Sequence, residues 1–103
     1  MDNIFFEVTT PLNVLVRTTV DYWNVITSLK HPVMQGKEDA VIETLKSPEA
    51  IRKSITDDSV FLYYRYDGLH YICVVVKHLN NHGFIITCYR TDKFKIGEKI
   101  WPN

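Results

Sequence analysis

The sequence predicts a single α+β domain, in which an N-terminal β-hairpin and two helices pack on one face of an antiparallel β-meander. Two observations predict this class, and a third sets its size. Apolar residues recur with a helical period between residues 19 and 46, whereas from residue 60 onward they form strand-like runs. Helices that cover one side of an antiparallel sheet make an α+β domain. A chain of 103 residues can bury one core but not two, so we expect residues 1–103 to be one domain.

The first third of the chain is expected to hold a hairpin and a helix. Residues 4–9 and 14–18 are β-rich runs on either side of a proline, which predicts a hairpin. Thr19 can cap the helix that follows. Its apolar positions recur at helical spacing: Val20, Trp23, Ile26 and Leu29. Pro32 ends the helix, because the residue before a proline, here His31, is pushed out of the α region.

Between residues 37 and 60 we expect one more helix and one segment of undecided structure. A second helix is expected over residues 37–46, with a buried stripe made of Val41, Ile42 and Leu45. Residues 48–53 fit either another helical turn or a short edge strand, and Ile51 is expected to anchor them in the core. Three strands are expected next, at residues 60–66, 70–79 and 84–90. A last segment, residues 95–101, is a candidate edge strand.

Side-chain alternation assigns the two faces of the last two long strands. The more apolar set in the final strand is expected to face the core: Phe84, Ile86 and Cys88. The alternate set faces away: Ile85, Thr87 and Tyr89. In the strand before it, the core row is Ile72, Val74 and Val76. A hydroxyl and a phenol on a rigid sheet, with a cation beside them, are suited to gripping a phosphate.

The loop between these strands decides which cation joins Thr87 and Tyr89. A three-residue loop, Asn80 to His82, would place Lys77 on their face, whereas a loop of two or four residues would place His78 there. Continuity of the apolar row favours the three-residue loop, and therefore Lys77.

The turn before them decides between two further side chains. Asp67-Gly68 predicts a two-residue hairpin loop, which would add Tyr64 to the same face. A longer turn would present Arg65 instead.

Composition limits the classes of function. The chain has 12 Lys plus Arg against 12 Asp plus Glu, a net charge of +0, which argues against sequence-blind nucleic-acid binding through a broad basic face.

No apolar run approaches the ~20 residues that cross a bilayer, and the N-terminus lacks the basic start of a signal peptide, so we expect a soluble, cytoplasmic protein. Cys73 and Cys88 lie in apolar runs without CxxC spacing, which indicates buried, reduced thiols. No carboxylate and histidine cluster has metal-ligand spacing, so neither a metal nor a cofactor is expected.

Three further groups each have two interpretations. His31 either donates and accepts protons near neutral pH or is a surface histidine that ends a helix. Arg52 either lies over the sheet edge or points into solvent. Four tyrosines either stack bases or form ordinary cross-strand packing: Tyr63, Tyr64, Tyr66 and Tyr71.

Several blocks of residues, taken in order, resemble a known family. The blocks are His31-Pro32 after a Trp-containing helix, Glu43-Thr44-Leu45 with Pro48 and Ile51-Arg52, Tyr63-Tyr64-Arg65, Val74-Val75-Val76-Lys77, and Gly83-Phe84-Ile85-Ile86-Thr87 with Tyr89, Thr91, Gly97 and Trp101. Together they resemble the small phage- and toxin-associated proteins of the barnase–EndoU–colicin–RelE-like (BECR) superfamily. The resemblance spans roughly residues 14 to 101, and the ordered set is more specific than any single block.

The resemblance implies a metal-independent endoribonuclease that cleaves RNA by attack of the ribose 2′-OH. By matching position, His31 would be the general acid/base, and Thr87 and Tyr89 would hold the scissile phosphate. Arg52 and Lys77 would offset its developing charge, with Tyr64 or Arg65 as a further substrate contact. Such a protein would be a toxin or a phage-associated effector with RNA as its substrate and a cognate antitoxin or inhibitor as its partner. The alternative is a non-catalytic module of the same fold that binds RNA or protein.

Overall fold

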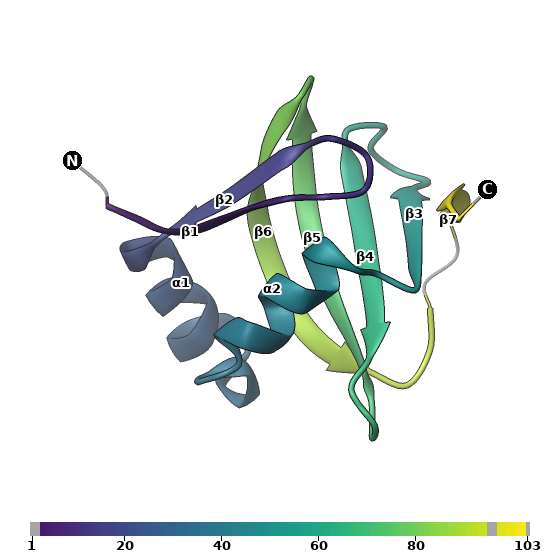
Figure 1. The fold of residues 1–103 in the computed structure, drawn as a ribbon. Coiled ribbons are helices and arrows are strands. Elements are labelled where there is room, and N and C mark those ends of the chain that lie inside the picture. The colour runs from purple at the N-terminus through teal and green to yellow at the C-terminus, as the bar shows by residue number, and fades with distance from the viewer. Residues whose placement is uncertain (1–2, 95–96, 103) are drawn as a thin grey trace.

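Seven strands form one mixed sheet, and two helices lie together on one side of it (Figure 1). The computed structural model describes residues 3–94 and 97–102. The order of strands across the sheet is β1-β2-β6-β5-β4-β3-β7. Along the chain the elements are β1 (Ile4–Thr9), β2 (Leu15–Thr19), α1 (Val20–Val25), a π-helical turn (Ile26–Lys30), a 3₁₀ turn (Pro32–Met34), α2 (Glu38–Lys46), β3 (Ala50–Ser54), β4 (Val60–Tyr66), β5 (Tyr71–Leu79), β6 (His82–Thr91) and β7 (Gly97–Trp101). The predicted α+β class is confirmed.

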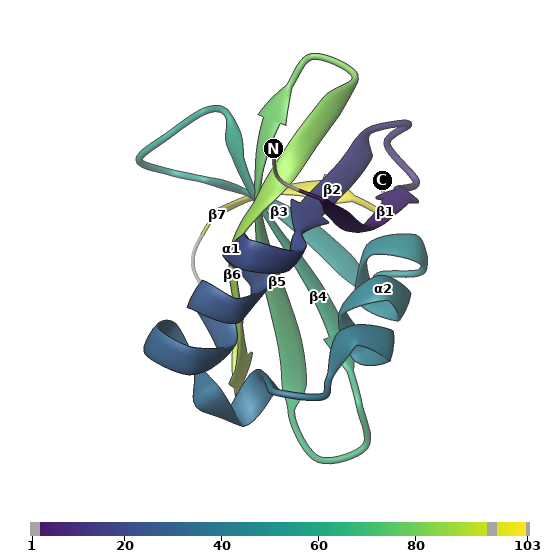
Figure 2. The same ribbon diagram turned by 90° about the vertical axis from the view of Figure 1, so that its left-hand side faces the viewer.

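The prediction of a purely antiparallel sheet is wrong at one pairing. β1 and β2 form the expected hairpin, and β3, β4, β5 and β6 pair antiparallel in sequence order. The hairpin joins the other strands through β2, whose residues 15–17 pair in parallel with residues 82–84 of β6. The hairpin therefore extends the sheet (Figure 2). No local pattern could predict this contact, because it joins segments that are far apart in the sequence.

The undecided segment around Ile51 is an interior strand. β3 pairs with β4 on one side and with β7 on the other, and Ile51 is fully buried as expected. β7 supplies the predicted C-terminal edge from Gly97 onward, while the predicted start of that edge, residues 95 and 96, lies outside the described residues.

The first predicted helix changes geometry before it ends. Thr19 caps α1 through a hydrogen bond that Tyr22 N–H donates to its hydroxyl. From Ile26 the chain forms a π turn, in which His31 N–H donates to Ile26 O. The wider turn changes which side chains face the sheet, so Thr27 is buried and Leu29, expected in the core, is 79% exposed.

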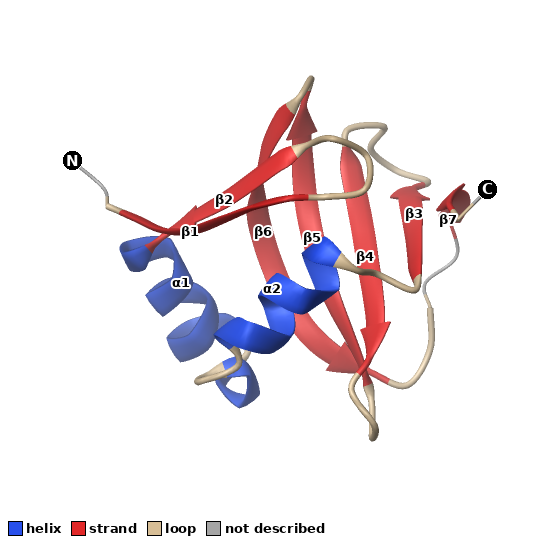
Figure 3. Cartoon of the chain, viewed as in Figure 1, coloured by secondary structure: helices blue, strands red, loops and turns tan. Residues whose placement is uncertain are grey.

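The core lies between the helices and the sheet (Figure 3). The core includes Trp23 and Ile26 from the first helical segment and Val41 and Leu45 from α2, which are apolar positions that the helical spacing identified. On the sheet side, the row predicted from β5 is confirmed: Ile72, Val74 and Val76. We call this side of the sheet the helix face and the opposite side the far face. A second, smaller cluster on the far face contains Leu62, Tyr64 and Cys73.

A β-bulge reverses part of the predicted register of β6. Val75 pairs with Thr87, but Val76 pairs with Ile85, so Ile86 is the extra residue on β6. Ile85 is consequently fully buried on the helix face, whereas Phe84, which alternation placed in the core, is 43% exposed. Cys88 lies in the core as predicted. The placement of Phe84 and Ile86 in the core row and of Ile85 on the far face is therefore wrong.

The bulge also explains why Lys77 shares a face with Thr87 despite a wrong loop prediction. Leu79 pairs with His82, so the loop has two residues, with Asn80 in the left-handed region at φ 64°. A two-residue loop alone would have turned His78 toward the face of Thr87. The extra residue at the bulge restores the parity, so Lys77, which pairs with Phe84, shares the far face with Thr87.

The turn at Asp67 is two residues longer than predicted. Tyr66 pairs with Tyr71, which leaves a four-residue loop. Lengthening a loop by two residues preserves side-chain parity, so Tyr64 stays on the far face, opposite Cys73. Arg65 pairs with Ile72 on the helix face, and the expectation that a longer turn would bring Arg65 to the far face is wrong.

Candidate functional site

The far face holds five of the seven predicted site residues in cross-strand rows. One row runs Arg52, Leu62, Val75 and Thr87. The next row along the strands runs Ala50, Tyr64, Cys73 and Tyr89. A third row runs Glu7, Arg17, Phe84, Lys77 and Val60. The side chains of one row point to the same side of the sheet, so the rows fix which residues can meet.

His31 lies beside the far face because its helix is fixed to the edge of β6. The carbonyl of Ile86, at the bulge, accepts hydrogen bonds from Tyr22 Oη at 2.7 Å and from Lys30 Nζ at 3.2 Å. Lys30 Nζ also donates to Tyr22 Oη at 3.0 Å. This three-way contact fixes the end of the π turn directly before His31. The half-buried His31 ring then lies 5.5 Å from the ring of Tyr89, measured between centroids.

Tyr89 is chemically suited to donate a hydrogen bond. Burial raises the pKa of its phenol well above the usual value, and the neighbouring Cys73 raises it further. The phenol therefore keeps its proton throughout the physiological range. It can donate to a phosphoryl oxygen, but it is a poor acceptor for a proton from a ribose hydroxyl.

Thr87 has an uncommitted hydroxyl. Its Oγ1 is buried and has no hydrogen-bond partner among the described residues. A buried hydroxyl without a partner costs stability, so a native structure that keeps one calls for an explanation. The predicted role of Thr87, which is to hold a phosphate, would supply the missing partner once the side chains above it make room.

Arg52 is on the correct face but far from His31. Three strand spacings, about 14 Å, separate its backbone from that of Thr87 along their common row. Its guanidinium lies over the ring of Phe94, 5.2 Å from the ring centroid, and donates from Nη1 to Gly97 O at 3.5 Å. Arg52 Nε is buried without a partner among the described residues. These contacts direct Arg52 over the face of the sheet near β3, so it does not point straight into solvent.

Lys77 and Tyr64 are both engaged within the protein. Lys77 Nζ donates to Asp57 Oδ2 at 3.2 Å, and hydrogen bonds from Ser59 and from Lys77 lower the pKa of Asp57 to about 2. Tyr64 is fully buried, with its ring 4.3 Å from that of Phe94. Lys77 could still exchange partners at the surface, whereas Tyr64 supports the far face from within.

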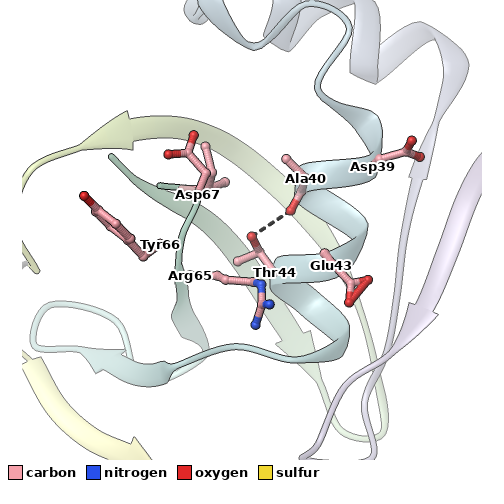
Figure 4. Close-up of a pocket in the computed structure, with 8 residues that line it drawn as sticks. Asp39, Ala40, Glu43, Thr44, Arg65, Tyr66 and Asp67 are labelled. Atoms are coloured by element: carbon pink, nitrogen blue, oxygen red, sulfur yellow. Dashed lines mark hydrogen bonds between the residues drawn. The ribbon is translucent and has the colours of Figure 1, made fainter. Parts of the chain in front are cut away.

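Arg65 lies in a separate pocket on the helix face, between α2 and the ends of β4 and β5 (Figure 4). It donates from Nη1 to Ser47 O at 2.6 Å. The pocket has a volume of about 290 Å³, and its wall carries three carboxylates: Asp39, Glu43 and Asp67. Such a wall repels phosphates, and the sheet separates it from Thr87 and Tyr89. The structure thus does not bring Arg65 together with the other predicted site residues.

The four tyrosines considered for base stacking divide between the two faces. Tyr63 is fully buried on the helix face, and its hydroxyl donates to Thr10 Oγ1 at 3.1 Å. Tyr66 and Tyr71 form an edge-on pair with centroids 5.2 Å apart, near the Asp67 turn. Only this pair, among the four, reaches the surface.

Arg17 and Phe84 also lie on the far face, although the sequence did not single out Arg17 and alternation predicted Phe84 in the core. The parallel pairing of β2 with β6 brings these two residues side by side on the far face, with Lys77 on the other side of Phe84. Two cations therefore flank a partly exposed aromatic ring, next to the row of Thr87. Alternation along β2, with Val14, Val16 and Thr18 buried, predicts that Arg17 faces away from the core. Its neighbour could not be predicted, because that depends on the parallel pairing.

Residues 3–94 and 97–102 contain no group of three His, Cys, Asp or Glu side chains placed to hold a metal ion. None of their helices has the length and apolar character needed to cross a membrane. Both cysteines are buried thiols that form no disulfide, as predicted. The chain matches no known family, no curated protein and no solved structure.

Proposed function

We propose that this chain is a metal-independent endoribonuclease in which His31 is the general acid/base. The observation that carries the proposal is the approach of the His31 ring to Tyr89, 5.5 Å between centroids, at the face that also holds Thr87. An imidazole and a protonated phenol meet there, and the uncommitted hydroxyl of Thr87 lies in the next cross-strand row on the same face. These are groups that RNA cleavage through the 2′-OH requires.

The proposed reaction balances with these groups alone. His31 takes the proton from a ribose 2′-OH, and the 2′ oxygen forms a bond to phosphorus. The bond from phosphorus to the 5′ oxygen breaks, and His31 returns the proton to that oxygen. The products are a 2′,3′-cyclic phosphate and a free 5′-OH, while hydrogen bonds from Tyr89 and Thr87 to the phosphoryl oxygens offset the charge of the transition state.

The positive charges that bind the phosphate would come from Lys77 and Arg17, which lie on either side of Phe84 in one cross-strand row. Lys77 already lies on this face, and its ion pair with Asp57 is exposed, so it contributes little to stability and a phosphate can compete for the amine. Arg17 lies on the other side of Phe84. The resemblance noted above adds that such a nuclease would act in the cytoplasm as a toxin or phage-associated effector, held in check by a cognate antitoxin.

The test is cleavage of single-stranded RNA by the purified protein in the presence of EDTA. We expect cleavage that leaves cyclic phosphate ends, and a decrease in kcat of about 10²–10⁴-fold in His31→Ala, which is the usual contribution of acid–base catalysis. His82→Ala is the matched control, because His82 is exposed at the β5–β6 turn and takes no part in the proposed reaction. Undiminished cleavage by His31→Ala would remove the assignment, and loss of cleavage in EDTA would point to a metal enzyme.

A second candidate function is a non-catalytic module that binds RNA or protein. The observation that favours it is that Arg52, Lys77 and Arg65 each already contact a group of this protein. Gel-shift measurements with the same RNA distinguish the two. RNA that the wild-type protein binds but does not cut would favour the binding module.

A further inference from the structure

A slot of about 280 Å³ opens in the sheet between β2 and β6, apart from the predicted site residues. It exists because the parallel ladder between these strands stops at Arg17 and Phe84. Beyond that point β2 leads into α1, and the next contact with β6 is the hydrogen bond from Tyr22 to Ile86 O. The residues that line the slot are Arg17, Thr18, Thr19, Tyr22, Phe84 and Ile85.

Two of the residues that line the slot carry buried polar atoms without partners among the described residues. Thr18 is only 3% exposed, and its Oγ1 has no hydrogen-bond partner among the described residues. Arg17 Nε is also buried without one, because the carboxylate of Glu7 lies 3.9 Å away, beyond hydrogen-bond distance. Buried polar groups in native proteins are nearly always paired. Both atoms are closed off from the slot as it stands, and a ligand that displaced the side chains over them would supply the missing hydrogen bonds.

The rest of the wall is apolar and partly aromatic. Phe84, Tyr22 and Ile85 present two rings and an aliphatic side chain. The volume lies just below the ~300–1,000 Å³ that is typical of drug-sized ligands, so it suits one small ring system. Proteins recognise an unstacked base by stacking it on aromatic rings or a guanidinium plane and by hydrogen bonds to its edge. The slot offers two aromatic rings for stacking, and Arg17 is one of its lining residues.

We propose that the slot binds a single unstacked nucleobase of the RNA. The choice of RNA as the source of the base rests on the proposed function. The position of the slot agrees with it, because Phe84 precedes Thr87 by three residues on β6 and pairs with Lys77. Tyr22 also links the slot to His31, since it belongs to the contact at Ile86 O that fixes the end of the π turn. A base held in the slot would set which phosphate lies over Thr87.

Binding of free nucleosides to the isotope-labelled 103-residue protein tests this without any cleavage. NMR titrations with adenosine, guanosine, cytidine and uridine are compared with titrations of ribose 5-phosphate and of benzoate. We expect at least one nucleoside to shift the amide signals of Arg17, Thr18 and Phe84, and ribose 5-phosphate to leave them unchanged. Phe84→Ala should weaken that binding about tenfold or more, since base stacking on an aromatic side chain supplies much of such affinity.

Two matched variants make the test specific. Thr18→Val keeps the shape of the side chain but removes the hydroxyl, and it should weaken nucleoside binding several-fold. Phe5→Ala is the control, because Phe5 is 43% exposed like Phe84 but does not line the slot. Binding should be unchanged in this variant.

Each of three results would overturn the proposal: no nucleoside shifts these signals, Phe84→Ala binds as tightly as wild type, or the slot binds benzoate and no nucleoside.

Failure of the nucleobase proposal can be distinguished from failure of the nuclease proposal. Nucleoside binding by a protein that cuts no RNA would retain the slot and remove the nuclease. Cleavage that depends on His31, without nucleoside binding, would do the reverse.

Discussion

Tyr63 and Thr87, on opposite faces of the sheet, differ in how their hydroxyl groups are hydrogen-bonded. On the helix face, Tyr63 donates to Thr10 Oγ1 and lies within 3.0 Å of His78 Nε2. Because the Tyr63 proton goes to Thr10, His78 Nε2–H is the donor in the second bond. On the far face, Thr87 Oγ1 and Arg52 Nε are buried without partners among the described residues.

This difference predicts which of the two hydroxyl groups stabilises the fold. A buried polar group with its partners in place specifies one arrangement, whereas a buried group without a partner costs free energy. Chains tolerate such costs mainly at functional sites. The hydroxyl groups of Tyr63 and Thr10 are therefore expected to support the fold, and the free energy of unfolding should respond differently to changes at Thr10 and at Thr87.

The largest expected effect on the free energy of unfolding is at the bulge, which places the adjacent residues Phe84 and Ile85 on opposite faces of the sheet. Ile85→Ala should lower the free energy of unfolding by about 2–5 kcal/mol, because it empties a fully buried position. Phe84→Ala removes more atoms but from a side chain that is 43% exposed, so we expect about 1 kcal/mol or less. Urea denaturation of both variants measures the two values. If Phe84→Ala were the more damaging change, the bulge at Ile86 would be wrong and unbroken alternation correct.

The second prediction concerns a satisfied hydroxyl of the helix face. Thr10 is 3% exposed, and its Oγ1 accepts hydrogen bonds from Tyr63 Oη and from Leu12 N–H. Thr10→Val leaves both donors without this acceptor, so we expect a loss of about 1–3 kcal/mol. Equilibrium unfolding checks the value, and a neutral result would mean that the network contributes nothing to the fold.

The third prediction uses the pH dependence of the same network. Burial lowers the pKa of His78 to about 4 from its ordinary 6.5. Between these values the unfolded chain binds a proton that the folded chain does not, so stability falls as the pH decreases from 6.5 to 4 and is unaffected above 6.5. After allowance for the partial exposure of His78, we expect a loss on the order of 1–2 kcal/mol.

His78→Phe supplies the control for this pH effect. The variant keeps a ring against Phe61, which lies 3.9 Å from the His78 ring between centroids, but it has no proton to bind. Its stability should therefore fall less than that of wild type over the same window. Parallel curves for the two proteins would show that another group titrates.

The sequence could predict only those parts of this contrast that depend on residues close together in the chain. Alternation in β5 correctly assigned Ile72, Val74 and Val76 to the core, because one strand without a bulge obeys a period of two. In β6 the same rule placed Phe84 wrongly, since a bulge inserts one residue and no residue type marks its position. The polar face was nevertheless identified, because the two-residue loop and the bulge cancel in parity at Lys77.

The candidate site shows the same limit. The proline after His31 predicted the end of its helix, but nothing local predicts that Tyr22 and Lys30 would fix that end at Ile86 O and bring His31 to Tyr89. The slot depends on a parallel pairing of segments that are distant in the sequence. Arg65 could not be excluded from the site before the length of the Asp67 turn was known.

The smallest expected change in the free energy of unfolding also gives the most direct test of the comparison between the two faces of the sheet. Thr87→Val on the far face makes the same chemical change as Thr10→Val, but it removes a buried hydroxyl that has no partner among the described residues. No hydrogen bond is lost and an unsatisfied group disappears, so we expect stability to stay within about 0.5 kcal/mol of wild type or to rise slightly. Unfolding measured beside Thr10→Val gives the difference between the two threonines directly. A loss as large as that of Thr10→Val would mean that the Thr87 hydroxyl supports the fold, and it would remove the reason for assigning this hydroxyl to a phosphate. If stability is retained, any decrease in RNA cleavage by the same variant reports on the site alone.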